Sequence, residues 1–308
     1  MNLRDLEYLV AVADHRHFGR AAAACGVSQP TLSAQLKKLE GELGVVLIER
    51  TSGGHLVTEV GSRIVTHART ILMEAAALRT VAEQSREPRT GRLRLGIFPT
   101  LAPYLLPHVL PGLQARMPNV DLRIIEDKSV TLLDQLTRGE LDTAVLALPV
   151  DGEDLVVEPL FREDFVLASP AEHPLSAVPG PIDPADLDGE DLLLLEDGHC
   201  MRDQTLDVCA STGARERAGF RASSLETLRH LVASGIGITL LPALSVAPPA
   251  FHPPSVSLRR FSEPVPHRTV ALVWRQSNPQ ADLLLEVAEI LRDLPPGLVH
   301  PRAHVTES

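Results

Sequence analysis

The first sixty residues alternate apolar and polar side chains at helical spacing. The apolar positions predict three helices, running from Leu3 to about His15–His17, from about Gly19 to a stop at Gly26, and over the leucines Leu32, Leu36, Leu39 and Leu43. Ser28 fits the N-cap of the third helix, and Pro30 fits its first turn, where a missing N–H costs little. Two short strands, around Val46–Ile48 and His55–Val57, would follow as a wing.

The third predicted helix carries, opposite its leucines, side chains that suit a DNA major groove. This face holds Pro30, Thr31, Ser33, Lys37 and Lys38, with Gln29 on its flank, and Arg50 would lie in the wing. Recognition helices read base edges with their N-terminal residues, while cations hold the phosphates. A small helical domain with a solvated polar face explains the spacing equally well, so the pattern alone leaves both interpretations open.

A long helix is predicted after the wing, from a cap at Thr58 to Glu87-Pro88. It carries a heptad stripe of Ile64, Ala68, Ile71, Ala75, Leu78 and Ala82. The stripe could pack on its own chain, but a long helix that leaves a small domain has little of that chain to cover it. We therefore expect a dimerising linker at residues 59–88, between a DNA-binding domain at 1–58 and a regulatory domain at 89–308.

The rest of the chain alternates apolar strand segments with helical segments, which is typical of α/β domains. One set of strands lies near 93–97, 121–126 and 143–148, and a second set lies near 164–169, 191–196 and 237–242. The segment 269–274 could return the chain to the first set. The pattern predicts two α/β lobes with a cleft between them.

Composition and charge narrow the class of protein. With 44% apolar and 22% charged residues the chain should fold, and no apolar run reaches the roughly 18 residues of a membrane span. The start of the chain lacks a basic and then apolar leader, so we expect a cytoplasmic protein without membrane contact. The net charge of -11 argues against nucleic-acid binding over the whole surface, but no acidic residue lies between His15 and Leu39, where a basic face can form.

The chain has three cysteines, and their number and spacing exclude two common uses. An odd number without a CxxC pair fits neither a secreted disulfide framework nor a zinc site. We expect no metal and no cofactor. Cys25 lies in the small-residue helix, where packing explains it, so any cysteine function should be redox chemistry at the other two.

Several N-terminal motifs resemble the winged helix-turn-helix of LysR-type transcriptional regulators: Ala21–Ala24, Val27–Ser33 and Leu43–Arg50. The resemblance covers nearly the whole chain. It implies a mainly α-helical winged helix-turn-helix with a linker helix, followed by a two-lobed α/β regulatory domain like that of periplasmic solute-binding proteins. It also implies the partners, which are double-stranded promoter DNA, further copies of the chain in a homotetramer built as a dimer of dimers, and RNA polymerase.

The segment Asp197–Gln204, with Cys209 following, resembles the sensing segment of hydrogen peroxide-responsive members of this family. The resemblance implies a regulator of the oxidative stress response in which peroxide oxidises Cys200 and Cys209 then forms a disulfide with it. It also implies a peroxide pocket of Thr100, Ser129, His199, Asp203 and Arg268. One alternative is a regulator that binds a small organic effector in the cleft. A thiol peroxidase is disfavoured by the DNA-binding and dimerising segments, so we do not expect an enzyme.

The residues around Cys200 favour such chemistry independently. Asp197-Gly198 predicts a turn and the next residues predict a helix, so Cys200 would lie near a helix N-terminus, where the dipole favours a thiolate. His199 and Arg202 could add positive charge or hydrogen-bond donors. If residues 200–209 are helical, their end Cα atoms lie roughly 13 Å apart, whereas a disulfide needs them within about 7 Å. The bond would then require local refolding.

Overall fold

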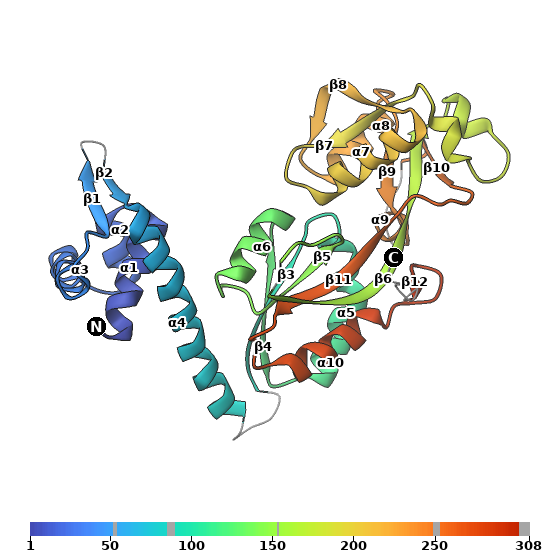
Figure 1. The fold of residues 1–308 in the computed structure, drawn as a ribbon. Coiled ribbons are helices and arrows are strands. Elements are labelled where there is room, and N and C mark those ends of the chain that lie inside the picture. The colour runs from blue at the N-terminus through green and yellow to red at the C-terminus, as the bar shows by residue number, and fades with distance from the viewer. Residues whose placement is uncertain (52–53, 85–89, 153, 249–252, 302–308) are drawn as a thin grey trace. The chain divides into compact units, whose positions relative to one another are not determined.

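The computed structural model describes residues 1–51, 54–84, 90–152, 154–248 and 253–301. They form two compact units, Met1–Pro88 and Arg89–Ser308 (Figure 1). The first unit has one hydrophobic core and the second unit has two. Within the described residues, no helix is both long enough and apolar enough to span a membrane.

The first unit is a small helical core with a two-stranded hairpin beside it. Its elements are α1 Leu3–His15, α2 Phe18–Ala24, α3 Gln29–Leu43, β1 Ile48–Thr51, β2 Gly54–Val57 and α4 Glu59–Gln84. Ser28 accepts a hydrogen bond from a backbone N–H in the first turn of α3, and Gly44 ends this helix with φ of 70°. The predicted helices and hairpin are confirmed, with two differences. The hairpin begins at Ile48 and not at Val46, and Leu43 is 37% exposed instead of buried because it lies in the last turn of α3.

Helix α4 packs its first half against α1 and leaves apolar side chains exposed farther along. The hydroxyl of Thr58 accepts a backbone hydrogen bond at 2.8 Å in the first turn, as its predicted capping role requires. Ala68 of the predicted stripe is 1% exposed in the core of the unit and Ile64 packs against that core, so this part of the stripe covers its own chain, whereas Ile71 and Leu78 are 42% and 74% exposed. The predicted end of the helix at Glu87-Pro88 lies outside the described residues.

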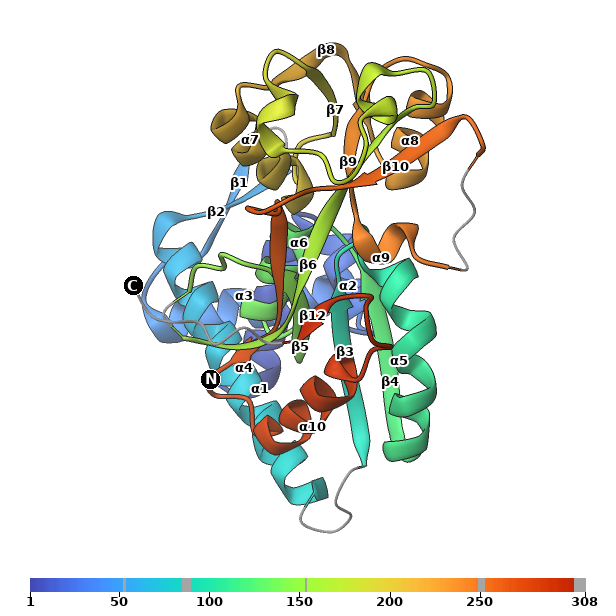
Figure 2. The same cartoon turned by 90° about the vertical axis from the view of Figure 1, so that its right-hand side faces the viewer.

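The second unit contains two lobes that share one mixed sheet (Figure 2). Lobe 1 comprises β3 Gly91–Ile97, α5 Ala102–Arg116, β4 Val120–Glu126, α6 Ser129–Thr137, β5 Thr143–Ala147, β11 His267–Arg275 and α10 Ala281–Arg292. Lobe 2 comprises the 3-10 helices η1 Pro174–Ala177 and η2 Pro184–Leu187, together with β7 Asp191–Leu195, α7 Cys200–Thr212, β8 Arg215–Ala222, α8 Leu225–Ala233, β9 Thr239–Pro242, α9 Ala243–Val246 and β10 Val256–Arg260. The strand order is β10-β6-β11-β5-β3-β4, and β9 and β12 (His300–Pro301) also pair with β6.

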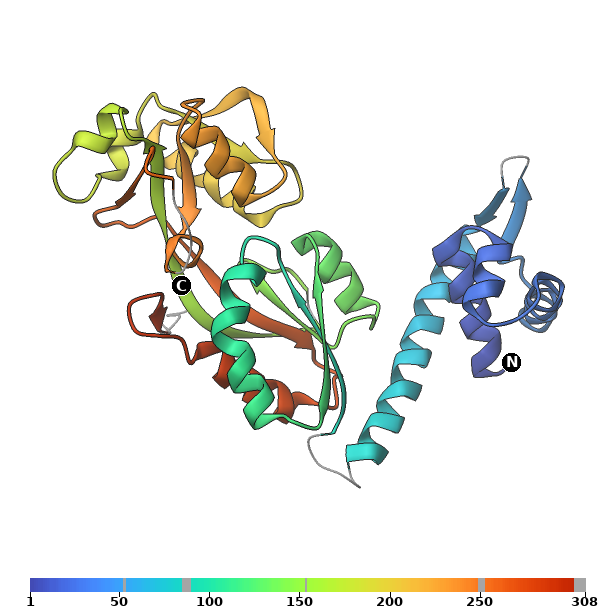
Figure 3. The ribbon, with the colours of Figure 1, turned by 180° about the vertical axis from the view of Figure 1, so that it is seen from behind.

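The long strand β6, Leu155–Pro170, connects the lobes (Figures 2 and 3). Leu160 belongs to the core of lobe 1, and Leu167 belongs to the core of lobe 2. Strand β11 pairs with both β5 and β6, which confirms the predicted return of the chain to the first set of strands. The sequence pattern found only the second half of β6 and missed β8, β10 and α10. The predicted two-lobed α/β architecture is confirmed.

Candidate functional site

Cys200 is the first residue of α7, directly after a tight turn. β7 ends at Leu195, and Gly198 in the turn has φ of 89°, a conformation that a residue with a Cβ rarely adopts. His199 occupies the N-cap position without capping the helix through its side chain. The predicted location of Cys200 at a helix N-terminus is confirmed.

The two cysteines of α7 lie in different surroundings, and both are free. Cys200 is half-buried and packs against the core of lobe 1, although its helix belongs to lobe 2. Cys209 is only 6% exposed, lies in the core of lobe 2, and has its pKa raised by burial. Because α7 is continuous from Cys200 to Thr212, its rise separates the two Cα atoms by about 13 Å. The helix as it stands excludes a disulfide, as the sequence predicted.

The imidazole of His199 is 5% exposed, and its Nε2 has no hydrogen-bond partner among the described residues. Burial is the main cause that lowers the pKa of His199, and the ammonium of Lys128 lowers it further, against the opposing Glu196 carboxylate. These effects favour the neutral form of the ring. An unsatisfied ring nitrogen next to a cysteine is positioned to bond a small polar molecule.

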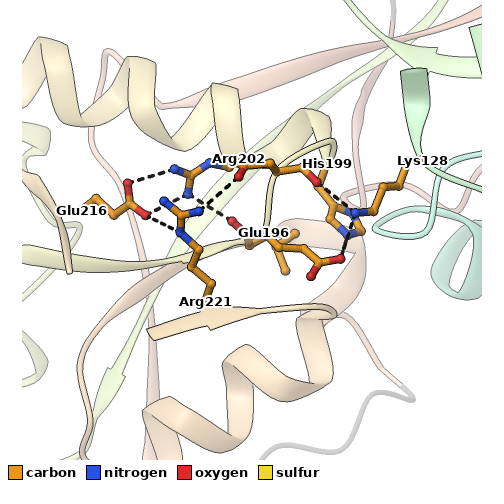
Figure 4. Close-up of polar contacts among 8 residues, drawn as sticks. Lys128, Glu196, His199, Arg202, Glu216 and Arg221 are labelled. Carbon is orange, nitrogen blue, oxygen red and sulfur yellow. Dashed lines mark hydrogen bonds and ion pairs between the residues drawn. The ribbon is translucent and has the colours of Figure 1, made fainter. Parts of the chain in front are cut away.

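Lys128 reaches from the start of α6, in lobe 1, to the turn that precedes Cys200 (Figure 4). Its Nζ donates to Glu196 Oε1 at 2.8 Å and to the carbonyl oxygen of Asp197 at 2.9 Å. Lys128 was not among the site residues expected from the sequence, although its being the only lysine after Lys38 could have drawn attention to it.

Arg202 lies one turn into α7 but bonds groups other than the cysteine. Its guanidinium donates to both carboxylate oxygens of Glu216, at 3.0 and 2.9 Å, and pairs with Asp197 at 2.9 Å (Figure 4). Arg221 bonds the same two carboxylates. The ion pairs of Arg202 and Arg221 therefore hold the first turn of α7 and the turn before it against β8. The Asp203 side chain is exposed on the same turn.

Thr100 and Arg268 are joined directly in the interior of the unit. Arg268 Nη1 donates to the Thr100 hydroxyl at 2.9 Å, and Nη2 donates to the Thr100 carbonyl at 3.1 Å. Glu163, fully buried like Arg268, accepts from Arg268 Nε at 2.7 Å and from the Leu244 N–H at 2.8 Å. Arg268 also lies over the ring of Phe98, 4.9 Å from its centroid. Glu163 is a further residue that the sequence pattern did not reveal.

The remaining predicted pocket residue, Ser129, is the first residue of α6 and follows Lys128. Its hydroxyl is buried and has no hydrogen-bond partner among the described residues. Of the predicted pocket residues, Thr100 and Arg268 are thus hydrogen-bonded to each other. His199 lies near Lys128, the residue before Ser129. An open groove of about 1100 Å³ is lined by Arg268 and by Gln204 of α7, and its lining does not include Thr100, Ser129, His199 or Cys200.

The candidate DNA-reading face of α3 is open to solvent. Gln29, Pro30, Thr31, Lys37 and Lys38 are exposed and Ser33 is half-buried. The hydroxyls of Ser28 and Thr31 lie 2.7 Å apart within hydrogen-bond distance, and Lys38 Nζ lies 3.8 Å from Glu42 Oε1. The backbone of Arg50 belongs to β1, but its side chain lies outside the described part of the structure.

Comparisons with known proteins match both units. Residues 3–62 match the family model described as "Bacterial regulatory helix-turn-helix protein, lysR family", and residues 86–295 match "LysR substrate binding domain". The DNA-binding transcriptional dual regulator OxyR of Escherichia coli is 49% identical over 295 residues, which cover 95% of each chain.

Two solved structures are also similar over nearly the whole chain. A full-length OxyR variant from Pseudomonas aeruginosa has a TM-score of 0.80 and 40% identity, and the match covers 99% of this chain and 98% of that one. A hydrogen peroxide-bound OxyR mutant from Corynebacterium glutamicum has a TM-score of 0.65 and 35% identity, with 94% and 91% covered.

Proposed function

Because the chain belongs to the LysR family of bacterial transcriptional regulators, we propose that it is a DNA-binding regulator of the oxidative stress response that senses hydrogen peroxide through Cys200. The observation that carries this proposal is the pairing of a half-buried cysteine at a helix N-terminus with a second cysteine in the same helix. The named functions of the relatives agree with it, since one binds DNA and another was solved with hydrogen peroxide.

The first chemical step oxidises Cys200. Its thiolate attacks one oxygen of hydrogen peroxide, an S–O bond forms and the O–O bond breaks. The leaving hydroxide takes up a proton and becomes water, and Cys200 becomes a sulfenic acid. We assign to Thr100, Ser129 and His199 the hydrogen bonds that hold the peroxide oxygens.

Two further residues support the pocket in this proposal. Arg268 fixes the Thr100 hydroxyl through the hydrogen bond it donates, and the buried Glu163 carboxylate holds the guanidinium in this position. Asp203, exposed on the first turn of α7, complements the positive end of the helix dipole and so stabilises the start of the reduced helix.

The second step joins the cysteines. The sulfur of Cys209 attacks the sulfur of the sulfenic acid, an S–S bond forms and the S–O bond breaks, and the departing hydroxide leaves as water with the proton of Cys209. The helix from Cys200 to Cys209 must open first, because its ends are too far apart for the bond. The reduced and disulfide forms are thus two different packings of one segment, which is what a switch requires.

The DNA-binding output rests on the first unit. Exposed residues of α3 read base edges, while Lys37, Lys38 and Arg50 bind phosphates. The apolar residues left exposed on α4, such as Ile71 and Leu78, pair with those of a second chain. The regulator accordingly acts as a homo-oligomer, for which we propose a dimer of dimers in the bacterial cytoplasm with RNA polymerase as the partner of the DNA-bound protein.

The test of the function is to separate the two cysteines. Cys200→Ser should abolish the response to peroxide, since a hydroxyl is a poor nucleophile without an activating base. Cys209→Ser should still form the sulfenic acid and then over-oxidise, because no partner traps it. Mass spectrometry of the thiols, with DNA footprints taken before and after peroxide, reads out both. If peroxide alters the footprint of the Cys200→Ser protein as strongly as that of the parent, the redox function is wrong and an organic effector in the groove is the better account.

Catalytic turnover distinguishes the regulator from a thiol peroxidase. A regulator should consume about one peroxide per Cys200–Cys209 pair when no reductant is present, because each pair supplies the two electrons of one disulfide. Sustained peroxide consumption with a thiol reductant, at a rate typical of enzymes, would contradict the assignment as a regulator without enzymatic activity.

A further inference from the structure

Lys128 binds the turn before Cys200 from the opposite lobe. It directly precedes α6, which packs in the core of lobe 1 through Leu132 and Leu136, whereas Glu196 and Asp197 follow β7 of lobe 2. The Lys128 ammonium therefore joins α6 of lobe 1 to the turn of lobe 2. It donates to the Glu196 carboxylate at 2.8 Å and to the backbone carbonyl of Asp197 at 2.9 Å (Figure 4).

The turn is shaped to accept this side chain closely. A Cβ added at Gly198 would lie 3.0 Å from Cδ of Lys128, and the backbone there has φ of 89°. The backbone conformation favours glycine, and any other side chain here would also push the lysine stem away by a few tenths of an ångström. The lysine stem thus packs on the turn while its ammonium bonds the two residues before it.

A lysine is unusual in this part of the chain. Residues 89–308 contain one lysine, and every other permanently cationic side chain in that range is arginine. An ammonium presents three donors around one atom and suits a carboxylate and a carbonyl that lie on different sides of it, whereas the planar guanidinium suits paired oxygens such as those of Glu216 bound by Arg202.

We propose that Lys128 is a positioning residue for the reaction with peroxide: it holds turn 196–198 of lobe 2 against lobe 1 and so presents His199 and Cys200 in their reactive arrangement. This inference rests on the function proposed above, because it assigns the lysine to the same site. Two further observations fit it. Cys200 itself packs on the core of lobe 1, and the positive charge of Lys128 helps to keep the neighbouring His199 neutral.

The decisive measurement is the rate of the first oxidation in full-length protein that carries Cys209→Ser, with the sulfenic acid trapped by a selective reagent. Lys128→Met removes the ammonium and retains the stem, and it should slow this reaction by roughly twofold to fivefold, the effect expected of a partly exposed ion pair. Lys128→Arg keeps the charge and should recover most of the rate. Arg138→Met, which removes the ion pair with Asp134 on the same helix, is the matched control and should react like the parent.

A second readout separates positioning from general stability. The pKa of His199, followed by NMR, should rise in Lys128→Met, since the cation that disfavours the imidazolium is gone, and it should stay low in Lys128→Arg. An amine-directed reagent gives a test without altering Lys128. Its labelling should be faster in Glu196→Gln, where one of the two hydrogen-bond acceptors of the ammonium is weakened.

The outcomes distinguish this inference from the function on which it depends. If the parent never forms a sulfenic acid at Cys200, the proposed function fails. If the parent reacts and Lys128→Met reacts at the same rate with the same His199 pKa, the positioning role alone is overturned. It is also overturned if Lys128→Arg is as slow as Lys128→Met and both unfold at the same lowered temperature, since loss of packing would then explain the rate.

Discussion

The opening of α7 before disulfide formation can be tested at Asp207, an exposed residue in the interior of this helix. Asp207→Ala and Asp207→Gly both remove the carboxylate, so they differ from each other only in helix propensity. Position 207 lies between the two cysteines. A change in the stability of the helix there should therefore alter how often the segment opens.

The expected magnitude follows from the helix. Glycine is about 0.8–1.0 kcal/mol less favourable than alanine at a helix interior position, which changes an opening equilibrium about four- to fivefold. If opening precedes the attack of Cys209, the glycine variant should form the disulfide about four to five times faster than the alanine variant. The same difference should make the reduction potential of the glycine variant about 20 mV more negative, because its reduced form is less stable.

The assay treats each variant with peroxide, quenches with an alkylating reagent over time, and counts free thiols by mass spectrometry. The first oxidation is measured separately in the Cys209→Ser background, where the two variants should react alike because position 207 lies about two helical turns from Cys200. Equal rates of disulfide formation in the two variants, with equal rates of the first step, would refute an obligatory opening of α7.

Two further predictions concern the DNA-binding unit. Ile71→Glu should dissociate the protein into monomers or unfold the end of α4, because it places a carboxylate in an apolar contact between chains. Sedimentation measures the size of the assembly. A folded monomer of the unsubstituted chain would contradict the pairing of α4. Lys38→Ala should weaken binding to all DNA sequences and lower the salt slope by about one, whereas Thr31→Ala or Ser33→Ala should relax base choice by about 1–3 kcal/mol per good contact. Titrations by fluorescence anisotropy at several salt concentrations check both, and an unchanged affinity and slope for Lys38→Ala would remove α3 from the DNA contact.

Features that depend on a few neighbouring residues could be predicted from the sequence. The cap at Ser28, the helix stop at Gly26 with its positive φ and the turn at Gly198 each result from the conformational preference of one residue, so they were identified without any tertiary information. The start of α7 at Cys200 and the separation of its cysteines followed in the same way. The roles of the pocket residues, in contrast, came from family resemblance and remain predictions.

Tertiary structure decided the partners of the charged residues. Glu163 and Arg268 are 105 positions apart and meet because β6 and β11 pair in an antiparallel register, and Lys128 meets Glu196 across the two lobes. No local pattern specifies such pairs, since a buried charge is tolerated only where the fold brings its counter-charge. For the same reason Arg202, which its position in the sequence suggested for the thiol, bonds Glu216 instead. The sequence by itself determined where the reactive cysteine lies on its helix, and only the packing of two lobes determined which polar groups surround it.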